Sequence, residues 1–231
     1  MCKDCGCETA NAVAVHGHRH LDLETRVLAV NDEAAAKNRA WLTERGIKTL
    51  NIISSPGSGK TQLLERTLER LAQRGVKVAV IVGDQQTDND AQRLQGKGAP
   101  VIQIETGASC HLNAQQIGNL LPEIIEEDTE LLLIENIGNL VCPAAFDLGE
   151  TAKVALLSVC EGEDKPVKYP LLFHDAAMVL LTKIDLIPHL DWDAEKCHQA
   201  LHQVAHHGKH LSVSARSGEG MKAWIDWLIG K

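Results

Sequence analysis

The chain has 231 residues, of which 44% are hydrophobic, so it can bury a sizeable core, and its formal net charge is −8. This charge argues against a nucleic-acid partner held by bulk electrostatics. No apolar run approaches the roughly 20 residues that span a membrane, so we expect no membrane partner. The first residues contain cysteine and histidine where a signal peptide has its apolar centre. We therefore expect a cytoplasmic protein whose seven cysteines stay reduced.

The first 26 residues are predicted to form a metal-binding tail. Cys2, Cys5 and Cys7 lie close to the terminal amine, and Gly6 lets the backbone fold so that their thiols converge. Thiolates together with nitrogen donors suit Zn²⁺ or square-planar Ni²⁺. A short histidine tract follows, at His16, His18 and His20. The tract is interpreted either as a weak metal reservoir or as a solvated linker.

A leading helix is predicted over residues 27–46, with Asn31 as its N-cap and Gly46 just beyond its end. In the compact domain, residues 47–231, apolar strands alternate with helical segments. We expect strands at residues 51–53, 76–82, 101–104, 131–134, 154–159, 178–181 and 211–213, and helices at about 60–74, 88–96, 113–127, 191–206 and 219–229. This alternation predicts an α/β fold in three layers, with a mostly parallel sheet and helices on both faces. In such sheets, ligands bind at the carboxyl ends of the strands.

A glycine-rich loop follows the first strand, with the sequence Ser-Ser-Pro-Gly-Ser-Gly-Lys-Thr at residues 54–61. The strand–loop–helix context predicts a P-loop NTPase, whose loop N–H groups converge on phosphate oxygens. Lys60 can reach the β- and γ-phosphates, and the Thr61 hydroxyl can ligate Mg²⁺. Ser54 replaces the glycine that opens the usual pattern and is small enough to be tolerated. The expected phosphate contacts are Pro56, Gly57, Ser58, Gly59, Lys60, Thr61 and Gln62.

Two further strand ends are predicted to act on the phosphates. Asp84 follows the second strand and is suited to hold Mg²⁺ or an attacking water, although a solvated acidic loop is the alternative. Glu135 follows the fourth strand, and Gly138 lies three residues further on. In this arrangement Glu135 can hold Mg²⁺ while the Gly138 N–H contacts the γ-phosphate. Hydrolysis would release both groups, which makes a switch.

The last two strand ends are predicted to bind the base. Asp185 can accept two hydrogen bonds from the N1–H and amino group of guanine, which adenine does not offer. The Lys183 stem can cover the face of the base, and the backbone at Ser214 and Ala215 can bind the guanine carbonyl oxygen. Thr182 stands where Asn is usual, so it keeps a hydroxyl but loses the amide, and we expect weaker guanine affinity.

A second metal site is predicted from Cys110, His111 and Cys142. Two thiolates and one imidazole supply three ligands, whereas a closed structural site needs four. The fourth ligand is then a water, a partner protein or a second subunit. Because Cys142 lies four residues after Gly138, metal geometry is expected to depend on the nucleotide switch. The alternative is two structural cysteines and a surface histidine.

The chain also has a histidine-rich stretch, with His198, His202, His206, His207 and His210. The first three recur every four residues and would share one helix face, which suits either metal chelation or a solvated surface. Two remaining cysteines are without an evident partner, and we expect them to be core thiols. They are Cys160 and Cys197.

Together these motifs resemble the HypB family of GTPases, which help to insert nickel into nickel–iron hydrogenase. The resemblance covers nearly the whole chain and includes the cysteines of the N-terminal tail. Its other segments are Ser-Ser-Pro-Gly-Ser-Gly-Lys-Thr at 54–61, Gly-Asp-Gln-Gln-Thr at 83–87, Cys110-His111, Glu-Asn-Ile-Gly-Asn-Leu-Val-Cys-Pro at 135–143, Phe-Asp-Leu-Gly-Glu at 146–150 and Glu-Gly-Glu-Asp-Lys-Pro at 161–166.

The resemblance implies a SIMIBI-class GTPase that binds GTP or GDP with Mg²⁺ and forms a nucleotide-dependent homodimer. It implies a Ni²⁺ or Zn²⁺ site of Cys110, His111 and Cys142 near the dimer interface, and a separate nickel site at the N-terminal cysteines. The implied partners are a HypA-type nickel chaperone and the precursor of the hydrogenase large subunit. Thr182 and the histidine-rich stretch 198–210 depart from the family pattern.

The main hypothesis is a nickel metallochaperone in which GTP binding and hydrolysis gate dimerisation and metal release. We expect slow hydrolysis, because none of the motifs supplies an arginine finger. One alternative is a nickel-buffering protein whose nucleotide site serves only assembly. Another is a different accessory GTPase such as the urease type, which has Cys-Pro-His where this chain has adjacent Cys110 and His111. A P-loop small-molecule kinase is a further alternative, but it would not need Asp185.

Overall fold

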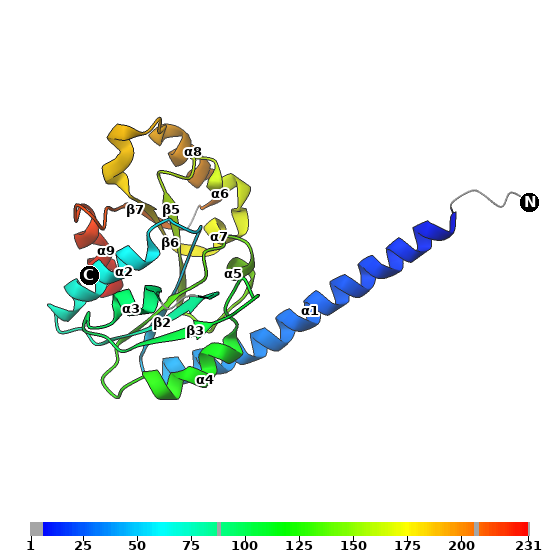
Figure 1. The fold of residues 1–231 in the computed structure, drawn as a ribbon, viewed down its shortest axis with the longest axis horizontal. Coiled ribbons are helices and arrows are strands. Elements are labelled where there is room, and N and C mark those ends of the chain that lie inside the picture. Colours follow the sequence, from blue (N-terminus) through cyan, green and yellow to red (C-terminus); the bar gives the residue numbers. More distant parts are fainter. Residues whose placement is uncertain (1–6, 87–88, 206–207, 231) are drawn as a thin grey trace, which may run out of the picture.

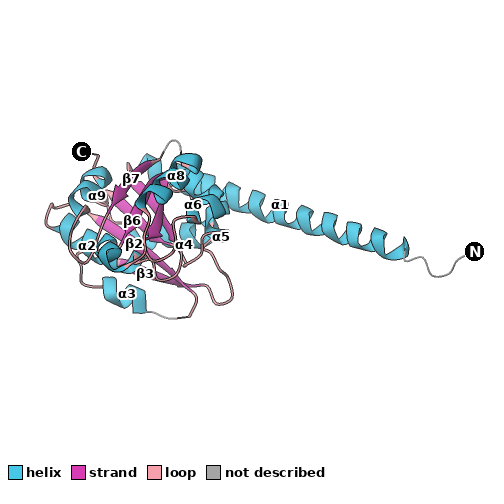
Figure 2. Cartoon of the chain, turned by 90° about the horizontal axis from the view of Figure 1, so that it is seen from above, coloured by secondary structure: helices cyan, strands magenta, loops and turns pink. Residues whose placement is uncertain are grey.

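The fold is given by a computed structural model (Figure 1, Figure 2). It describes residues 7–86, 89–205 and 208–230, with the backbone alone for residues 7–25. Among these residues, seven strands form one sheet in the order β3-β2-β4-β1-β5-β6-β7, and all neighbours are parallel. The strands are β1 (Lys48–Ser54), β2 (Val78–Asp84), β3 (Val101–Glu105), β4 (Leu131–Glu135), β5 (Ala152–Ser158), β6 (Ala176–Thr182) and β7 (Lys209–Ser212). The predicted parallel sheet is confirmed.

Helices cover both faces of this sheet, as Figure 2 shows from above. One face packs against α2 (Lys60–Ala72), α3 (Asn89–Leu94) and α9 (Met221–Leu228). The other face packs against α1 (Cys7–Glu44), α4 (Ala114–Ile124), α7 (Pro170–Asp175) and α8 (Ala194–Val204). The predicted three-layer α/β architecture is therefore confirmed.

Alternating side chains of the central strands explain the two cores. In β4, Leu131 and Leu133 point to the α2 side, whereas Leu132 and Ile134 point to the α4 side. All four are fully or almost fully buried. A strand that is apolar on both faces is stable only when helices cover both sides, which the continuous Leu-Leu-Leu-Ile run indicates.

Four short helices were not predicted from the sequence. They are α5 (Cys142–Ala145), α6 (Lys165–Lys168), α7 (Pro170–Asp175) and the 3₁₀ helix η1 (Ile184–His189). None exceeds six residues, so none shows the hydrophobic period on which helix prediction depends. The three α-helices each have proline in their first turn, where the missing N–H costs no hydrogen bond.

The leading helix is longer than predicted, and the expected N-cap at Asn31 is wrong. Helix α1 begins at Cys7, so most of the predicted tail is helical, and its N-terminal part projects from the domain (Figure 1). From Cys7 to Glu44 the sequence has one glycine, Gly17, and no proline, so nothing in it breaks a helix. No helix of the described residues, α1 included, is long and apolar enough to cross a membrane. Cys2 and Cys5 lie outside the described residues.

Asn31 and Asn38 instead attach α1 to the domain. Asn31 donates to the carbonyl of Asp147 at 2.7 Å and accepts from the first N–H of α4, that of Ala114, at 2.9 Å. Asn38 donates to the carbonyls of Ala114 and Leu148, at 2.7 and 3.0 Å. Both asparagine side chains are buried. The helix therefore holds two loops at once, one before α4 and one after α5.

The Asn38→Ala variant tests this attachment. Removing the amide leaves two buried carbonyls without their donor, so we expect the free energy of unfolding to fall by about 2 kcal/mol. Urea unfolding followed by circular dichroism measures the change. Lys37→Ala, on the exposed face of the same helix, is the matched control and should leave the midpoint unchanged. Equal midpoints for both variants would contradict the attachment.

Candidate functional site

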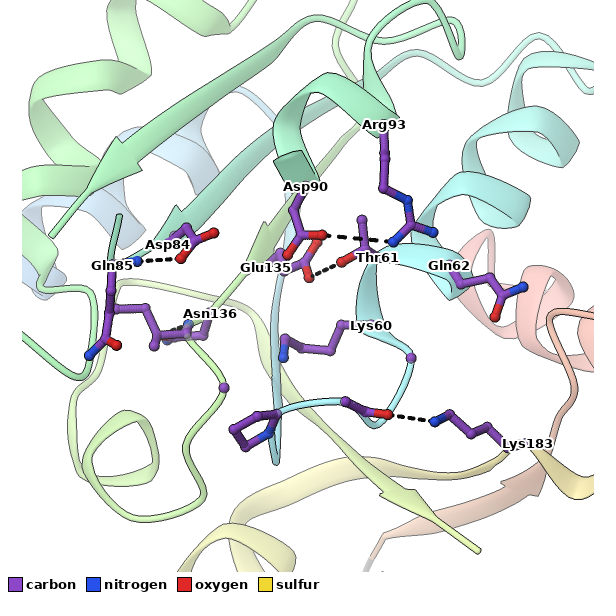
Figure 3. A pocket seen from close by; sticks show the side chains of 16 residues that line it. Lys60, Thr61, Gln62, Asp84, Gln85, Asp90, Arg93, Glu135, Asn136 and Lys183 are labelled. Atoms are coloured by element: carbon purple, nitrogen blue, oxygen red, sulfur yellow. Dashed lines mark hydrogen bonds and ion pairs between the residues drawn. The ribbon is translucent and has the colours of Figure 1, made fainter. Parts of the chain in front are cut away.

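The phosphate loop joins β1 to α2 and lines a cavity of about 490 Å³ (Figure 3). Strand β4 lies beside β1 in the sheet and β2 lies beside β4, so the carboxyl ends of these parallel strands open onto the same cavity. The lining residues are Pro56, Gly57, Gly59, Lys60, Thr61, Gln62, Gly83, Asp84, Gln85, Asp90, Arg93, Glu135, Asn136, Ile137, Gly138 and Lys183. The structure thus brings together the phosphate loop and the carboxylates that the sequence singled out.

Lys60 is almost completely buried at the base of the loop. Its Nζ donates to Ser54 Oγ at 3.1 Å, and the Ser58 hydroxyl donates to the same oxygen. Burial lowers the pKa of Lys60, and the nearby charge of Glu135 partly opposes this shift. Ser54, which departs from the usual glycine, therefore contributes an oxygen that holds Lys60 inside the loop.

Glu135 is the last residue of β4 and is 2% exposed. Its Oε1 accepts a hydrogen bond from Thr61 Oγ1 at 2.8 Å, and its Oε2 is buried without a partner among the described residues. Burial raises the pKa of Glu135 to about 7, although the charge of Lys60 lowers it. A buried carboxylate oxygen without a hydrogen bond is costly. It indicates that a cation or a donor belongs in this cavity.

Asp84 and Gly138 complete the predicted phosphate-acting set. Asp84 is the last residue of β2, and its Oδ1 accepts from the Gln85 N–H at 2.5 Å. Gly138 lies against the phosphate loop, because a Cβ added there would be 2.9 Å from Pro56 Cα. Only glycine fits this close approach, so the Gly138 backbone directly borders the loop that would hold the phosphates.

A second cavity of about 170 Å³ adjoins the first and is lined by Lys183, Asp185 and Ala215 of the predicted base-binding residues, whereas Ser214 is buried and does not line it. Both cavities are lined by Gly59, Gln62 and Lys183. Ser214 Oγ donates to Asp185 Oδ1 at 2.6 Å, which orients this carboxylate. The second cavity is lined by Ser58, Gly59, Gln62, Leu63, Thr182, Lys183, Asp185, Leu186, Val213, Ala215 and Arg216.

Two side chains connect the base cavity to the phosphate loop. Thr182 Oγ1 donates to the carbonyl of Ser58 at 2.8 Å, so a hydroxyl makes the connection for which Asn is usual. Lys183 Nζ donates to the carbonyl of Gly57 at 2.6 Å. Among the described residues, Lys183 is the one non-glycine with a positive φ, 60°. Such backbone strain is typical of binding sites.

Cys110, His111 and Cys142 form the one group of metal-ligating side chains in the described residues whose ligand atoms all lie within 4.8 Å. The two sulfur atoms are 2.9 Å apart, and Cys110 Sγ lies 3.8 Å from His111 Nδ1. The neighbouring Cys110 thiol and burial raise the pKa of Cys142, and burial lowers the pKa of His111. Neutral imidazole is the form that binds metal. The predicted trio is therefore brought together.

Two contacts hold the loop that carries Cys110 and His111 in place: a ring contact of His111 and a hydrogen bond with the segment that follows β4. The His111 ring packs against that of Phe146, with centroids 3.8 Å apart and ring planes tilted by 30°. Asn136, next to Glu135, is 1% exposed. Its Oδ1 accepts from the N–H of Leu112 at 3.3 Å, and its Nδ2 donates to Asn51 in β1 at 3.1 Å. The buried amide thus links the phosphate cavity to the loop that carries Cys110 and His111.

The other metal candidates are not brought together in the same way. His198 and His202 make an edge-to-face ring contact at 4.8 Å on α8, but they form no ligand group with His210 within 4.8 Å. His206 and His207 lie outside the described residues, as do the side chains of Cys7, His16, His18 and His20.

Of the two expected core thiols, one is buried and one is not. Cys197 is 3% exposed, and burial raises its pKa to about 11. The prediction for Cys160 is wrong, because β5 ends at Ser158 and Cys160 lies exposed in the following turn.

Sequence reasoning missed several cavity residues. Asn136 and Gln85 lie within the motifs at 135–143 and 83–87, but the sequence pattern alone predicts no role for either side chain. Asp90 and Arg93 lie on α3, whose six residues place them over the cavity. No motif includes Arg93, and only the packing of α3 beside α2 shows where it lies.

The comparisons with known proteins agree with this geometry. The family model of the CobW/HypB/UreG nucleotide-binding domain matches residues 48–212. The hydrogenase maturation factor HypB of Azotobacter vinelandii is 52% identical over 219 residues, which are 95% of this chain and 72% of that protein. HypB of Escherichia coli (strain K12) is 50% identical over 218 residues, 94% of this chain and 75% of that protein.

Solved structures are similar as well. HypB from Archaeoglobus fulgidus has a TM-score of 0.82 at 39% identity and covers 88% of this chain and 98% of its own. HypB from Helicobacter pylori in complex with nickel has a TM-score of 0.80 at 35% identity, covering 87% and 94%. A LAO/AO transport system kinase, at 20% identity and a TM-score of 0.52, shares the fold alone. The chain therefore belongs to the CobW/HypB/UreG family of nucleotide-binding proteins, within its HypB group.

Proposed function

We propose that the chain is a GTP-hydrolysing nickel metallochaperone that delivers nickel to the large-subunit precursor of nickel–iron hydrogenase. GTP binding and hydrolysis would gate dimerisation and metal release. One observation carries the proposal: the eight-residue segment 135–142 begins with Glu135 in the phosphate cavity and ends with Cys142 in the metal cluster. A change at the nucleotide is therefore transmitted over a short stretch of backbone to a metal ligand.

Guanine selectivity follows from Asp185 in the second cavity. Its carboxylate accepts from Ser214 through Oδ1, which leaves further lone pairs for the guanine N1–H and amino group. Lys183 lies at the boundary between the two cavities, where its stem can cover the base. Ala215 also lines this cavity, and we propose that its backbone N–H binds the guanine carbonyl oxygen, because the Ser214 N–H already donates to the carbonyl of Glu219 at 2.9 Å.

The phosphate cavity also fits Mg²⁺. Glu135 Oε2 is the buried oxygen without a partner, and Thr61 Oγ1 and the Asp84 carboxylate add oxygen donors, the type that Mg²⁺ prefers. When bound, Mg²⁺ would neutralise charge on the β- and γ-phosphates. Lys60 then contacts the phosphates in place of Ser54, the Gly138 N–H binds the γ-phosphate, and Asp84 orients the attacking water.

Nickel is the proposed cargo of the cluster of Cys110, His111 and Cys142. Two thiolates and an imidazole suit Ni²⁺ or Zn²⁺, and they leave a position for a fourth ligand. A related HypB is solved in complex with nickel, and the relatives are named for hydrogenase maturation. We propose that a second subunit, a HypA-type chaperone or the hydrogenase precursor completes the site. The N-terminal Cys2, Cys5 and Cys7 are proposed as a separate nickel site.

Substitution of Lys60 tests the enzymatic part. In Lys60→Ala the buried ammonium that neutralises the phosphates is lost, so phosphate release from GTP with Mg²⁺ should fall at least 100-fold. Steady-state release of inorganic phosphate is the measurement. Lys77→Ala removes an exposed surface lysine and should keep the wild-type rate. Phosphate release that survives Lys60→Ala would refute hydrolysis at this site.

Base selectivity is tested by Asp185→Asn. An amide can donate to the C2 carbonyl of xanthine but no longer accepts two hydrogen bonds from guanine, so the preference should shift from guanine to xanthine nucleotides by at least tenfold. Competition with labelled GDP measures the shift. Asp128→Asn, at an exposed ion pair, is the control and should keep the guanine preference. An unchanged preference in Asp185→Asn would favour a nucleotide site that does not read the base through this residue.

Coupling is tested by titrating Ni²⁺ in the presence of GDP and of a non-hydrolysable GTP analogue. We expect the wild-type affinity to differ at least threefold between the two nucleotides, and Cys110→Ala to lose both the tight binding and the difference. Cys160→Ala removes an exposed thiol outside the cluster and should behave as wild type. Calorimetry gives the affinities. If the nickel affinity is the same with GDP and with the GTP analogue, the protein buffers nickel and the gating proposal fails.

A further inference from the structure

Arg93 is a positively charged residue of the phosphate cavity, and no sequence motif predicts a role for it. It lies in the second half of α3 and lines the cavity together with Lys60, Thr61 and Glu135. Figure 3 shows its guanidinium reaching down from α3 beside the start of α2, across the cavity from Lys183. Its position is fixed by the fold, because α2 and α3 pack on the same face of the sheet.

The guanidinium is held by carboxylates at the rim of the cavity. Arg93 Nη2 lies 2.6 Å from Glu65 Oε2, and Nη1 lies 3.8 Å from Asp90 Oδ1. The Arg93 side chain is 46% exposed. An ion pair exposed to this degree contributes little to stability, because water screens the two charges. The contact with Glu65 is therefore easily exchanged for a ligand with more charge.

A nucleoside triphosphate is such a ligand. A guanidinium presents a planar set of N–H donors that match phosphate oxygens two at a time. The other cavity cations already have partners on the loop: Lys60 contacts Ser54 and Lys183 contacts Gly57. Arg93 approaches from the opposite element, α3, so it can add donors on a side of the phosphates that the loop does not cover.

We propose that Arg93 is a catalytic residue that exchanges Glu65 for oxygens of the γ-phosphoryl group and stabilises the charge of the transition state within the same chain. In the reaction, a water oxygen bonds to the γ-phosphorus while the bond to the β–γ bridging oxygen breaks. The electron pair stays with GDP, and the water proton leaves with the released phosphate. Arg93 stays protonated throughout. This inference rests on the proposed GTP hydrolysis.

A structural role for Arg93 makes a different prediction. If its pair with Glu65 only holds α3 against α2, its removal should lower stability and loosen GDP as well as GTP. A transition-state role lowers kcat and leaves the affinity for GDP unchanged. The two are separated by kinetics and by binding of GDP with aluminium fluoride, which imitates the phosphoryl group in transfer.

The experiment compares Arg93→Ala, Arg93→Lys and Glu65→Gln with a matched control. The control is Arg66→Ala, which removes an arginine 51% exposed on α2 and paired with Glu69, outside the phosphate cavity. Each full-length variant is assayed for kcat and KM with GTP and Mg²⁺. Affinities for GDP, with and without aluminium fluoride, and thermal unfolding midpoints are measured alongside.

We expect Arg93→Ala to lower kcat at least tenfold, a small part of the roughly 10³–10⁵-fold that an arginine finger supplies in related hydrolases. GDP affinity and the unfolding midpoint should stay at wild-type values, and the aluminium fluoride complex should be lost. Arg93→Lys should retain an intermediate kcat, and guanidinium salts should partly rescue Arg93→Ala. Glu65→Gln should keep or raise kcat, because it frees the guanidinium.

Two results would overturn the assignment. Wild-type kcat in Arg93→Ala refutes it while leaving the GTPase itself intact. Loss of GDP affinity and of stability in both Arg93 variants shows a structural role instead. If the wild-type protein releases no phosphate from GTP, the proposed function fails and the role of Arg93 fails with it, so the two failures are told apart by the wild-type rate.

Discussion

The arrangement of both sites depends on one buried side chain, the amide of Asn136. Its oxygen accepts from the N–H groups of Ile137 and Leu112, and its nitrogen donates to Asn51 in β1. Buried amides that satisfy donors and acceptors in several segments fix those segments relative to one another. Here the segments are the central strand β1, the segment that follows β4 and the loop with Cys110 and His111. The Asn136 amide therefore joins the nucleotide cavity to the metal cluster through direct hydrogen bonds.

The same network continues outward to the leading helix. Asn51 donates to Glu150, and Glu150 accepts from the N–H of Leu148, whose carbonyl is held by Asn38 of α1. A continuous set of buried hydrogen bonds therefore runs from the sheet to α1, past the loop that follows Cys142. The hydrogen bonds between its members offset part of the cost of burying these polar groups, although burial still raises the pKa of Glu150.

Much of the fold could be predicted because its signals are local. The apolar strand runs, the glycines that end helices and the phosphate loop each have a short sequence pattern with one physical meaning. The strand-end rule predicts that Asp84, Glu135 and Asp185 lie at one edge of the sheet, and in the structure they line the two adjoining cavities there. What could not be predicted comes from packing between distant segments. Asn31 is a residue type that is common at N-caps, but its side chain accepts a hydrogen bond from the first N–H of a different helix, α4. Arg93 reaches the cavity only because a six-residue helix lies beside α2.

Thr182 shows how the residue type at one position changes the number of hydrogen-bond donors that the site offers to a base. A hydroxyl has one proton to donate, and in Thr182 that proton is used on the carbonyl of Ser58. None is left for the N7 acceptor of a purine, which an asparagine amide with two protons could serve while also holding the loop. Guanine and adenine share the N7 acceptor, so the loss of this contact would weaken the binding of either purine without changing the choice of base, a choice that we propose Asp185 makes. The one donor of Thr182 thus stabilises the phosphate loop, and the proposed nucleotide site would bind its purine with one hydrogen bond fewer than an asparagine would give.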